Sequence, residues 1–182
     1  MSGIIGGAGS KSGVIGAIPK NHISAITWRM LNHESTGAPD PIGGGGSDWE
    51  IADDTKMEYY LGESTQITES SGYFSFGSTG YWLILGSATA VTDGGTVEAQ
   101  YFELQATTNN SAYSNIAVAI GGSMFAQGAM SSMSLNTIVK VTDIANHKVK
   151  LKGQSITGAD GYFLGSSADN KTALTFIKLG EI

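Results

Sequence analysis

The sequence feature that most constrains the fold is an aromatic-rich stretch at residues 72–84, GYFSFGSTGYWLI. Its first half alternates aromatic with small residues, and its second half is almost continuously apolar. The break between them is Gly77-Ser78-Thr79-Gly80. Aromatic and branched side chains favour extended backbone, and glycines interrupt it. The stretch therefore predicts two strands joined by a turn.

Most of the remaining chain has the same character, with short apolar or alternating runs between Gly, Ser, Asn and Asp turns. Residues 23–31 alternate Ile26, Trp28 and Met30 with small and polar residues, which predicts a half-buried strand. Residues 97–106 predict another strand, with a helix as the alternative because Glu, Gln and Ala are good helix formers. Further strands are expected at residues 48–53, 56–61, 115–125, 131–141, 147–152, 162–164 and 172–179. Roughly ten short strands at regular spacing predict an all-β sandwich or barrel.

Two of these strands carry additional signals. Residues 115–125 are interrupted by Gly121-Gly122, where we expect a bulge or a bend. In residues 147–152, Val149 and Leu151 alternate with lysines. Lysines along one face are typical of an exposed edge strand or a solvated side of a sheet.

Composition restricts the classes of function. The chain has 182 residues, 41% of them apolar, which is enough for one domain with a proper core and an appendage. Its formal net charge is −6 with only 10 Lys and Arg, so it offers no basic cluster for nucleic-acid phosphates. No apolar run is long enough to span a bilayer, and residues 1–13 lack the apolar core of a secretory signal. The absence of cysteine fits assembly in a reducing cytoplasm.

The first twenty residues differ from the rest. They alternate Gly and Ser with the apolar pairs Ile4-Ile5 and Val14-Ile15. Such a segment has too little apolar area to offset the entropy of ordering its backbone, so a neighbouring chain is expected to order it. The sequence therefore divides into a Gly-rich N-terminal docking arm at residues 1–20 and a β-domain at residues 21–182.

The central stretch resembles a known family. Gly72-x-Phe74-x-Phe76 followed by Gly80-Tyr81-x-Leu83-Ile84 resembles two adjoining strands of the complement-type globular head, in the tumour-necrosis-factor-like jelly-roll superfamily. Residues 131–141, then Asp143, then residues 149–151 resemble that family's strand pair around a turn aspartate, although Thr142-Asp143 and an insertion replace its usual Gly-Asp. Residues 173–177 stand where its closing aromatic strand would be. The resemblance implies an antiparallel jelly-roll β-sandwich over residues 23–179.

The same resemblance implies a homotrimer that packs around a threefold axis through one sheet. The expected axis-facing residues are Tyr73, Tyr81, Leu83, Tyr101 and Phe176. For each of them, a place in the core of the single chain is the alternative.

The Gly-rich N-terminus, in turn, is similar to the first residues of tail and fibre proteins of marine bacteriophages. Together, the two resemblances imply a phage virion structural protein, assembled in the host cytoplasm.

Three functions remain open at this point. The first is a trimeric tail fibre or spike component, docked by Ile4, Ile5, Val14 and Ile15 and used in host attachment. The second is a capsid decoration protein, and the third is a tail-associated polysaccharide-degrading enzyme. Aromatic residues beside turn signals suit recognition of a host polysaccharide or protein. Those expected on receptor-facing loops are Trp49, Tyr113 and Tyr162, with burial under each loop as the alternative.

No catalytic apparatus is evident, so we expect no enzyme activity and no cofactor. The GGAGSKSG run lacks the glycine directly before Lys11, the preceding strand and the following helix of a phosphate loop. His22, His33 and His147 lack zinc-ligand spacing. Aspartates in probable turns are more typical of backbone caps than of calcium ligands, so no metal is expected. Nothing in the spacing of Glu58, Glu63 and Glu69 indicates a glycosidase pair rather than a solvated face.

Overall fold

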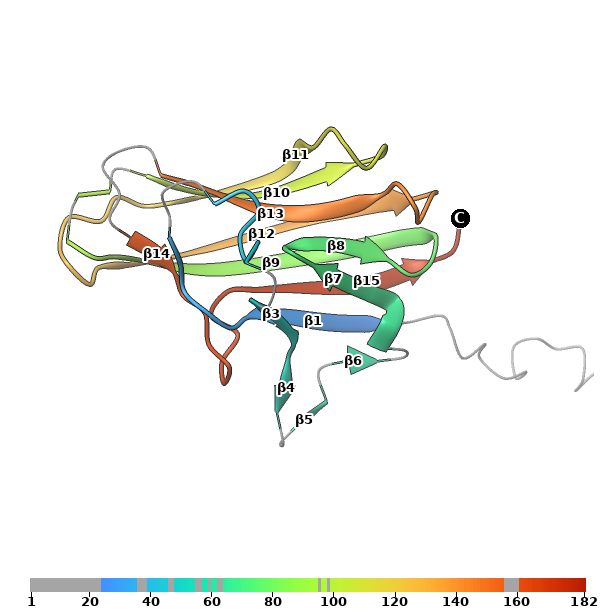
Figure 1. The fold of residues 1–182 in the computed structure, drawn as a ribbon, viewed down its shortest axis with the longest axis horizontal. Helices are drawn as coiled ribbons and strands as arrows, with labels where there is room; N and C mark the ends of the chain where they lie inside the picture. The colour runs from blue at the N-terminus through green and yellow to red at the C-terminus, as the bar shows by residue number, and fades with distance from the viewer. Residues whose placement is uncertain are drawn as a thin grey trace, which may run out of the picture.

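The computed structural model describes residues 24–35, 39–45, 48–54, 57–58, 60–61, 64–94, 96–97, 99–155 and 161–182. They form a two-layered antiparallel β-sandwich (Figure 1). The larger sheet contains β1 (Ala25–Met30), β2 (Glu34–Ser35), β3 (Trp49–Ile51), β6 (Tyr60–Leu61), β9 (Gly80–Thr92), β12 (Met130–Val141), β14 (Gly161–Phe163) and β15 (Ala173–Gly180). The smaller sheet contains β7 (Ile67–Ser70), β8 (Tyr73–Phe76), β10 (Gln100–Thr107), β11 (Ser114–Gly121) and β13 (Lys148–Ser155). A separate small pair joins β4 (Asp53–Asp54) to β5 (Met57–Glu58), and a 3₁₀ turn, η1 (Ser64–Gln66), precedes β7.

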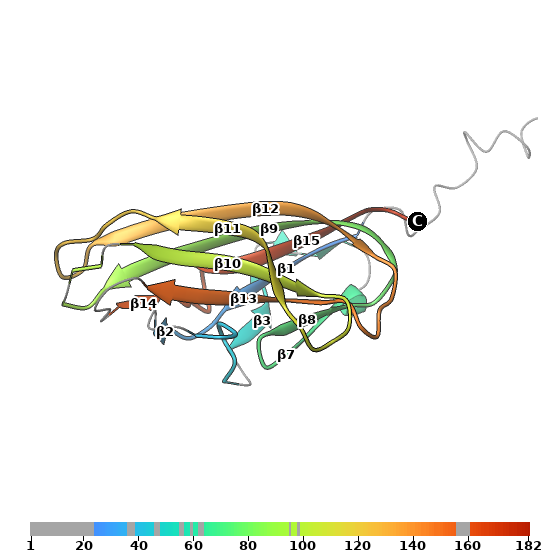
Figure 2. The ribbon, with the colours of Figure 1, turned by 90° about the horizontal axis from the view of Figure 1, so that it is seen from above.

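The two sheets are built largely from long-range pairings. In the larger sheet, β9 pairs with β12 along its whole length and with β15 and β14 on its other side, and β15 pairs in turn with β1. In the smaller sheet the order is β11-β10-β13-β8-β7. Seen from above, β11 and β12 lie next to each other along one edge of the sandwich (Figure 2). The antiparallel jelly-roll sandwich expected from the sequence is confirmed.

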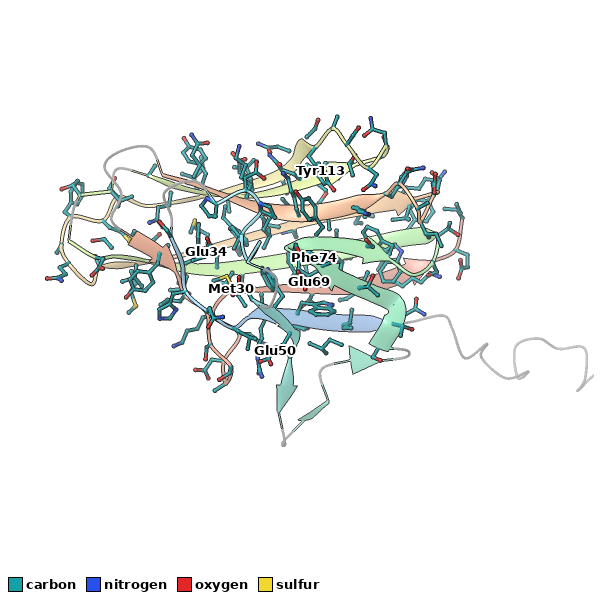
Figure 3. The ribbon with its side chains drawn as sticks, in the orientation of Figure 1. Met30, Glu34, Glu50, Glu69, Phe74 and Tyr113 are labelled. Atoms are coloured by element: carbon teal, nitrogen blue, oxygen red, sulfur yellow. The ribbon has the colours of Figure 1, made fainter. Side chains whose placement is uncertain are left out.

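The core lies between the sheets and is filled by one alternating set of side chains from each strand. Phe74 is fully buried at its centre, and its ring lies 5.2 Å from that of Trp49 and 5.5 Å from that of Phe176 (Figure 3). Trp82 from β9 and Phe102 from β10 are also fully buried. Aromatic pairs at these centroid distances add specific geometry to the apolar area that they bury.

The central stretch forms two strands, as predicted, but they belong to different sheets. β8 ends at Phe76 in the smaller sheet and β9 begins at Gly80 in the larger one. Gly80 adopts a φ of 140°, and a Cβ there would lie 2.4 Å from the carbonyl oxygen of Gly180. Glycine is therefore required where the chain crosses from one layer to the other.

Several strands differ in detail from the prediction. Residues 100–107 form a strand, so the helical alternative is wrong. The strand expected over residues 115–125, with a bulge or bend at Gly121-Gly122, ends at Gly121. Ser131 Oγ and Met133 Sδ of β12 occupy the space that a side chain at Gly121 would need. The lysine-bearing strand β13 lies between β10 and β8 rather than at an edge.

Both ends of the described chain lie at the same end of the sandwich (Figure 1). Ala25 pairs with Ile177, and the amide of Lys178 donates a hydrogen bond of 2.8 Å to the carbonyl oxygen of Ser24. The proposed boundary at residue 20 and the docking residues Ile4, Ile5, Val14 and Ile15 fall outside the described residues.

Candidate interaction surfaces

The outer face of the larger sheet carries an apolar row across four strands. Ile138 of β12 is paired with Leu83 of β9, Leu83 with Ile177 of β15, and Ile177 with Ala25 of β1. Alternation along each strand directs these side chains away from the core, because their chain neighbours Trp82, Ile84 and Phe176 are fully buried.

Other apolar side chains extend this row into a patch. We call it the apolar face, and its members are Tyr81, Leu83, Leu85, Ile138, Ile177 and Leu179. Ile138 is 60% exposed, Leu179 50% and Leu85 40%. The rows toward the other end of the sheet become polar, with Thr27 and Thr175 hydrogen-bonded to each other and Arg29 paired with Glu50 at 2.7 Å. A contiguous exposed apolar patch with a polar border is typical of a protein–protein contact.

A second apolar surface lies along the edge formed by β11 and β12. We call it the apolar edge, and its members are Ile116, Val118, Ile120, Phe125 and Met130. Ile120 is 63% exposed, Met130 67% and Phe125 73%. β11 is the last strand of the smaller sheet and pairs only with β10 among the described strands. An apolar edge strand left uncovered would be an aggregation site, so it favours a partner.

The outer face of the smaller sheet is polar over β7, β8 and β13, whereas Val118 and Ile120 of the apolar edge lie on the same outer side at β11. The cross-strand pairings place Ser70, Tyr73, Lys150 and Gln105 in one row, and Thr68, Ser75, Lys148 and Thr107 in the next. Beside these rows the β10–β11 loop contributes Asn110, Ser111 and Tyr113. Together they form an open groove of about 430 Å³, lined by Ser70, Ser71, Tyr73, Ser75, Asn110, Ser111, Tyr113 and Lys148. We call it the polar groove.

One wall of the polar groove is held in place by Lys150. Its ammonium lies 4.6 Å from the centroid of the Tyr113 ring and 5.8 Å from that of Tyr73, and it forms an ion pair with Asp40. The two tyrosine rings are 5.6 Å apart and tilted by 52°. Lys150 is only 7% exposed, so its charge is compensated at a largely desolvated position. Burial, together with the neighbouring Tyr73, raises the pKa of the Tyr113 phenol.

The structure does not bring the five expected axis-facing residues together. Tyr81 and Leu83 belong to the apolar face, whereas Tyr73 and Tyr101 lie on the outer side of the smaller sheet. Phe176 is completely buried between the sheets, in contact with Phe74 and Phe76, so it belongs to the core instead. The set spans three environments because residue type alone does not indicate the sheet, or the face of the sheet, on which a strand places its side chains.

The three aromatics expected on receptor-facing loops also separate. Trp49 is 5% exposed in β3, and its indole Nε1 donates a hydrogen bond to the carbonyl oxygen of Ile42, so its placement on an exposed loop is wrong. Tyr113 lies on the β10–β11 loop (Figure 3). It lines the polar groove. Tyr162 lies in β14, half-buried under the stacked ring of His33 at 4.9 Å.

Two further carboxylates accept hydrogen bonds within turns. Glu69 accepts a hydrogen bond of 2.6 Å from the amide of Gly72 in the β7–β8 turn, and burial raises its pKa. Asp143 accepts hydrogen bonds from Asn146 and from the amide of Ala145, which lower its pKa. Glu63 and the side chain of Glu58 lie outside the description. Within the described ranges no three His, Asp or Glu residues gather as metal ligands, and no helix has the length and hydropathy to cross a membrane.

Sequence reasoning missed Ile138, the apolar edge and the role of Lys150. Alternation in residues 131–141 could have indicated that Ile138 and Ser131 lie on opposite faces. Nothing local could have indicated that Ile138 lies beside Leu83, since the two residues are 55 positions apart in the chain (138 − 83).

Comparisons with known proteins establish the fold class. No family model and no curated protein sequence matches the chain. Among solved structures, murine APRIL at pH 8.5 matches with a TM-score of 0.59 and 13% identity, covering 86% of this chain and 99% of that chain. Eiger TNF from S. frugiperda matches with a TM-score of 0.57 and 12% identity, covering 87% and 93%. The chain therefore has the tumour-necrosis-factor-like jelly-roll fold.

Proposed function

We propose that this protein is a trimeric virion structural protein of a phage, docked through its N-terminal arm and used in host attachment. The observation that carries the oligomeric part is the outward-facing apolar row Ile138–Leu83–Ile177 on the larger sheet, in which Ile138 is exposed and the other two side chains are half-buried. Leaving such a row in water costs about 25 cal/mol for each Å² of apolar surface, and a subunit contact removes that cost.

The position of the two apolar surfaces favours a ring. The apolar face occupies part of the outside of the larger sheet, whereas the apolar edge runs along β11 and the start of β12. When one surface of a subunit contacts a different surface of its neighbour, the subunits associate head to tail. Such an arrangement closes into a ring when the rotation between neighbouring subunits divides a full turn evenly. A threefold ring agrees with the fold, since jelly rolls of the tumour-necrosis-factor type typically form trimers.

The virion role comes from the N-terminal resemblance. In this proposal Ile4, Ile5, Val14 and Ile15 insert into a neighbouring virion protein, and the intervening glycines let the backbone pass close to that neighbour. The arm leads into β1 at the end of the sandwich where β15 also ends, which leaves the opposite end and the outside of the smaller sheet available to a host.

The first experiment is the mass of the purified full-length chain in solution, measured by light scattering. We expect three times the chain mass of 18.9 kDa. The trimer would be contradicted if the protein were monomeric at all concentrations and its copies made no contact with one another in isolated particles.

A second experiment tests the arm. We expect full-length protein carrying both Ile5→Asp and Val14→Asp to retain its oligomeric mass and to lose incorporation into particles. Normal incorporation of this variant would show the docking hypothesis to be wrong. The copy number per particle separates a fibre, with a few dozen copies or fewer, from the alternative of a capsid decoration protein, with hundreds.

A further inference from the structure

We propose that the polar groove on the smaller sheet binds an acidic carbohydrate, with a sugar ring beside Tyr113 and a carboxylate of the sugar paired with Lys148. This inference rests on the attachment role proposed above and names the class of ligand that the attachment uses. The groove is formed by residues of β7, β8, β13 and the β10–β11 loop, so a single subunit provides it complete.

The lining matches a sugar in size and in hydrogen-bonding capacity. A groove of about 430 Å³ falls within the range of small-molecule sites. Four serine hydroxyls can each donate and accept hydrogen bonds, and the amide of Asn110 supplies both functions in one group. Sugar hydroxyls need such paired donors and acceptors. The rings of Tyr73 and Tyr113 provide apolar surface, which suits the C–H faces of a pyranose.

The groove is organised before any ligand arrives. Asn109 Oδ1 accepts hydrogen bonds from the amides of Ser111 and Ala112, at 3.1 and 3.0 Å, which fixes the course of the loop. Asn110 adopts a left-handed φ of 55°, and its backbone N–H donates a hydrogen bond of 3.1 Å to the carbonyl oxygen of Asn146.

The opposite wall is equally fixed. The β7–β8 turn has φ values of 54° at Ser71 and 82° at Gly72, and Glu69 accepts the hydrogen bond of the Gly72 amide. Lys150 holds the Tyr113 ring from outside the groove. Little conformational entropy then remains to be lost on binding, which favours affinity for a small ligand.

The charge of the lining favours an acidic sugar over a neutral one. Lys148 is the one charged residue that lines the groove, and within the described part of the chain no carboxylate forms an ion pair with it. By contrast, Lys150 is already paired with Asp40 and packed against both tyrosines. Lys148 therefore supplies an ammonium available to a carboxylate of the ligand, as a charge-assisted hydrogen bond.

The groove remains accessible in the proposed trimer. Its strand residues point outward from the smaller sheet, whereas the apolar face points outward from the larger one. In the proposed ring the apolar face of one subunit meets the apolar edge of the next, and neither surface includes a residue that lines the groove. The subunit contacts and the ligand site therefore use different residues.

The test uses two matched ligand pairs that differ only at C6 of the sugar. The methyl glycosides of glucuronic and galacturonic acid are compared with those of glucose and galactose by saturation-transfer NMR on the full-length protein, at about 10 mM, a concentration suited to millimolar Kd values. We expect saturation transfer to at least one uronate, and binding of its neutral counterpart about tenfold weaker, which corresponds to one charge-assisted contact of about 1.4 kcal/mol.

Three variants locate the binding. Ser70→Trp places a large ring in the groove from an exposed strand position and should abolish the signal. Lys148→Met should remove the preference for the uronate while leaving weak binding of both sugars. Lys171→Met, an exposed lysine in the loop before β15, is the matched control and should bind like the unmodified protein.

Three results would overturn the inference: no saturation transfer to any of the four sugars, a signal that survives Ser70→Trp, or equal binding of uronate and neutral sugar. Failure of this experiment is distinguishable from failure of the proposed function, because the mass in solution and the incorporation of the arm variant are measured without any sugar. A trimer that incorporates into particles but binds none of these ligands contradicts the sugar site alone.

Discussion

The outer side of β9 and β15 is apolar and that of β7, β8 and β13 is polar, although both arise from the same alternation of side chains. On the larger sheet, the residues that point away from the core include Leu85 and Ile138, which are exposed, and Leu83, which is half-buried. On the smaller sheet, the equivalent rows contain Ser70, Ser75 and lysines. Alternation along a strand separates core-facing from outward-facing side chains. The composition of the outward-facing side chains then indicates which surface contacts a protein and which contacts water or a polar ligand.

The largest effect is expected from a charge in the apolar face. Leu83→Asp places a carboxylate between Ile138 and Ile177, where association would desolvate it without a partner. We expect association to weaken by about 1,000-fold, or about 4 kcal/mol, and the protein to be monomeric by light scattering. Ser75→Asp, on the outer face of the smaller sheet, is the matched control and should keep the oligomeric mass. Equal masses for both variants would mean that the two faces do not differ in function.

A second prediction tests whether both faces depend on the crossing between the sheets. Gly80→Ala introduces a Cβ 2.4 Å from the Gly180 carbonyl oxygen at a φ of 140°. Strain and overpacking should lower the free energy of unfolding by about 2–4 kcal/mol, measured by urea denaturation. Gly122→Ala, where a Cβ meets nothing within 4 Å, should have little effect. A neutral Gly80→Ala would mean that the crossing tolerates a side chain.

A third prediction concerns the smaller sheet alone. Lys150→Met removes the cation that contacts both tyrosine rings and the ion pair with Asp40, which is partly exposed. We expect a loss of about 1–2 kcal/mol in the free energy of unfolding, most of it from the cation–π contacts because solvent screens the ion pair. Lys152→Met, whose ammonium is 3.9 Å from Asp40 at a more exposed position, should cost less than about 0.5 kcal/mol. Equal losses would show that the tyrosine contacts contribute nothing.

The smallest effect is a pH dependence of the groove wall. Burial and Tyr73 raise the pKa of Tyr113, so the folded protein holds this proton more tightly than the unfolded chain does. The resulting contribution to stability is fully present below the unfolded pKa, about 10, and is lost as pH rises through the folded pKa. Tyrosinate formation is followed by ultraviolet titration of the protein and of Tyr113→Phe. The difference between the two curves reports Tyr113, which should ionise at higher pH than the exposed tyrosines. An earlier ionisation would contradict the burial of this ring.

The sequence predicted much of the fold and less of the surfaces. Alternation in residues 23–31 predicted the buried side chains Ile26 and Met30, and the glycines at 77 and 80 marked the end of one strand and the start of the next. Tyr81 and Leu83, predicted to face a trimer axis, do point away from the core, but Phe176 and Trp49 are buried, since their exposure depends on layers that pack over them.

By itself, the sequence determined which segments are extended, where the chain must turn, and which side of each strand is apolar. These properties depend on residues a few positions apart, through backbone preference and the two-residue period of a strand. Only the tertiary structure decided that β8 and β9 lie in different sheets, that Ile138 lies beside Leu83, and that Lys150 lies between Tyr113 and Asp40. The reason is that these neighbours are set by pairing between distant strands, which no local pattern encodes.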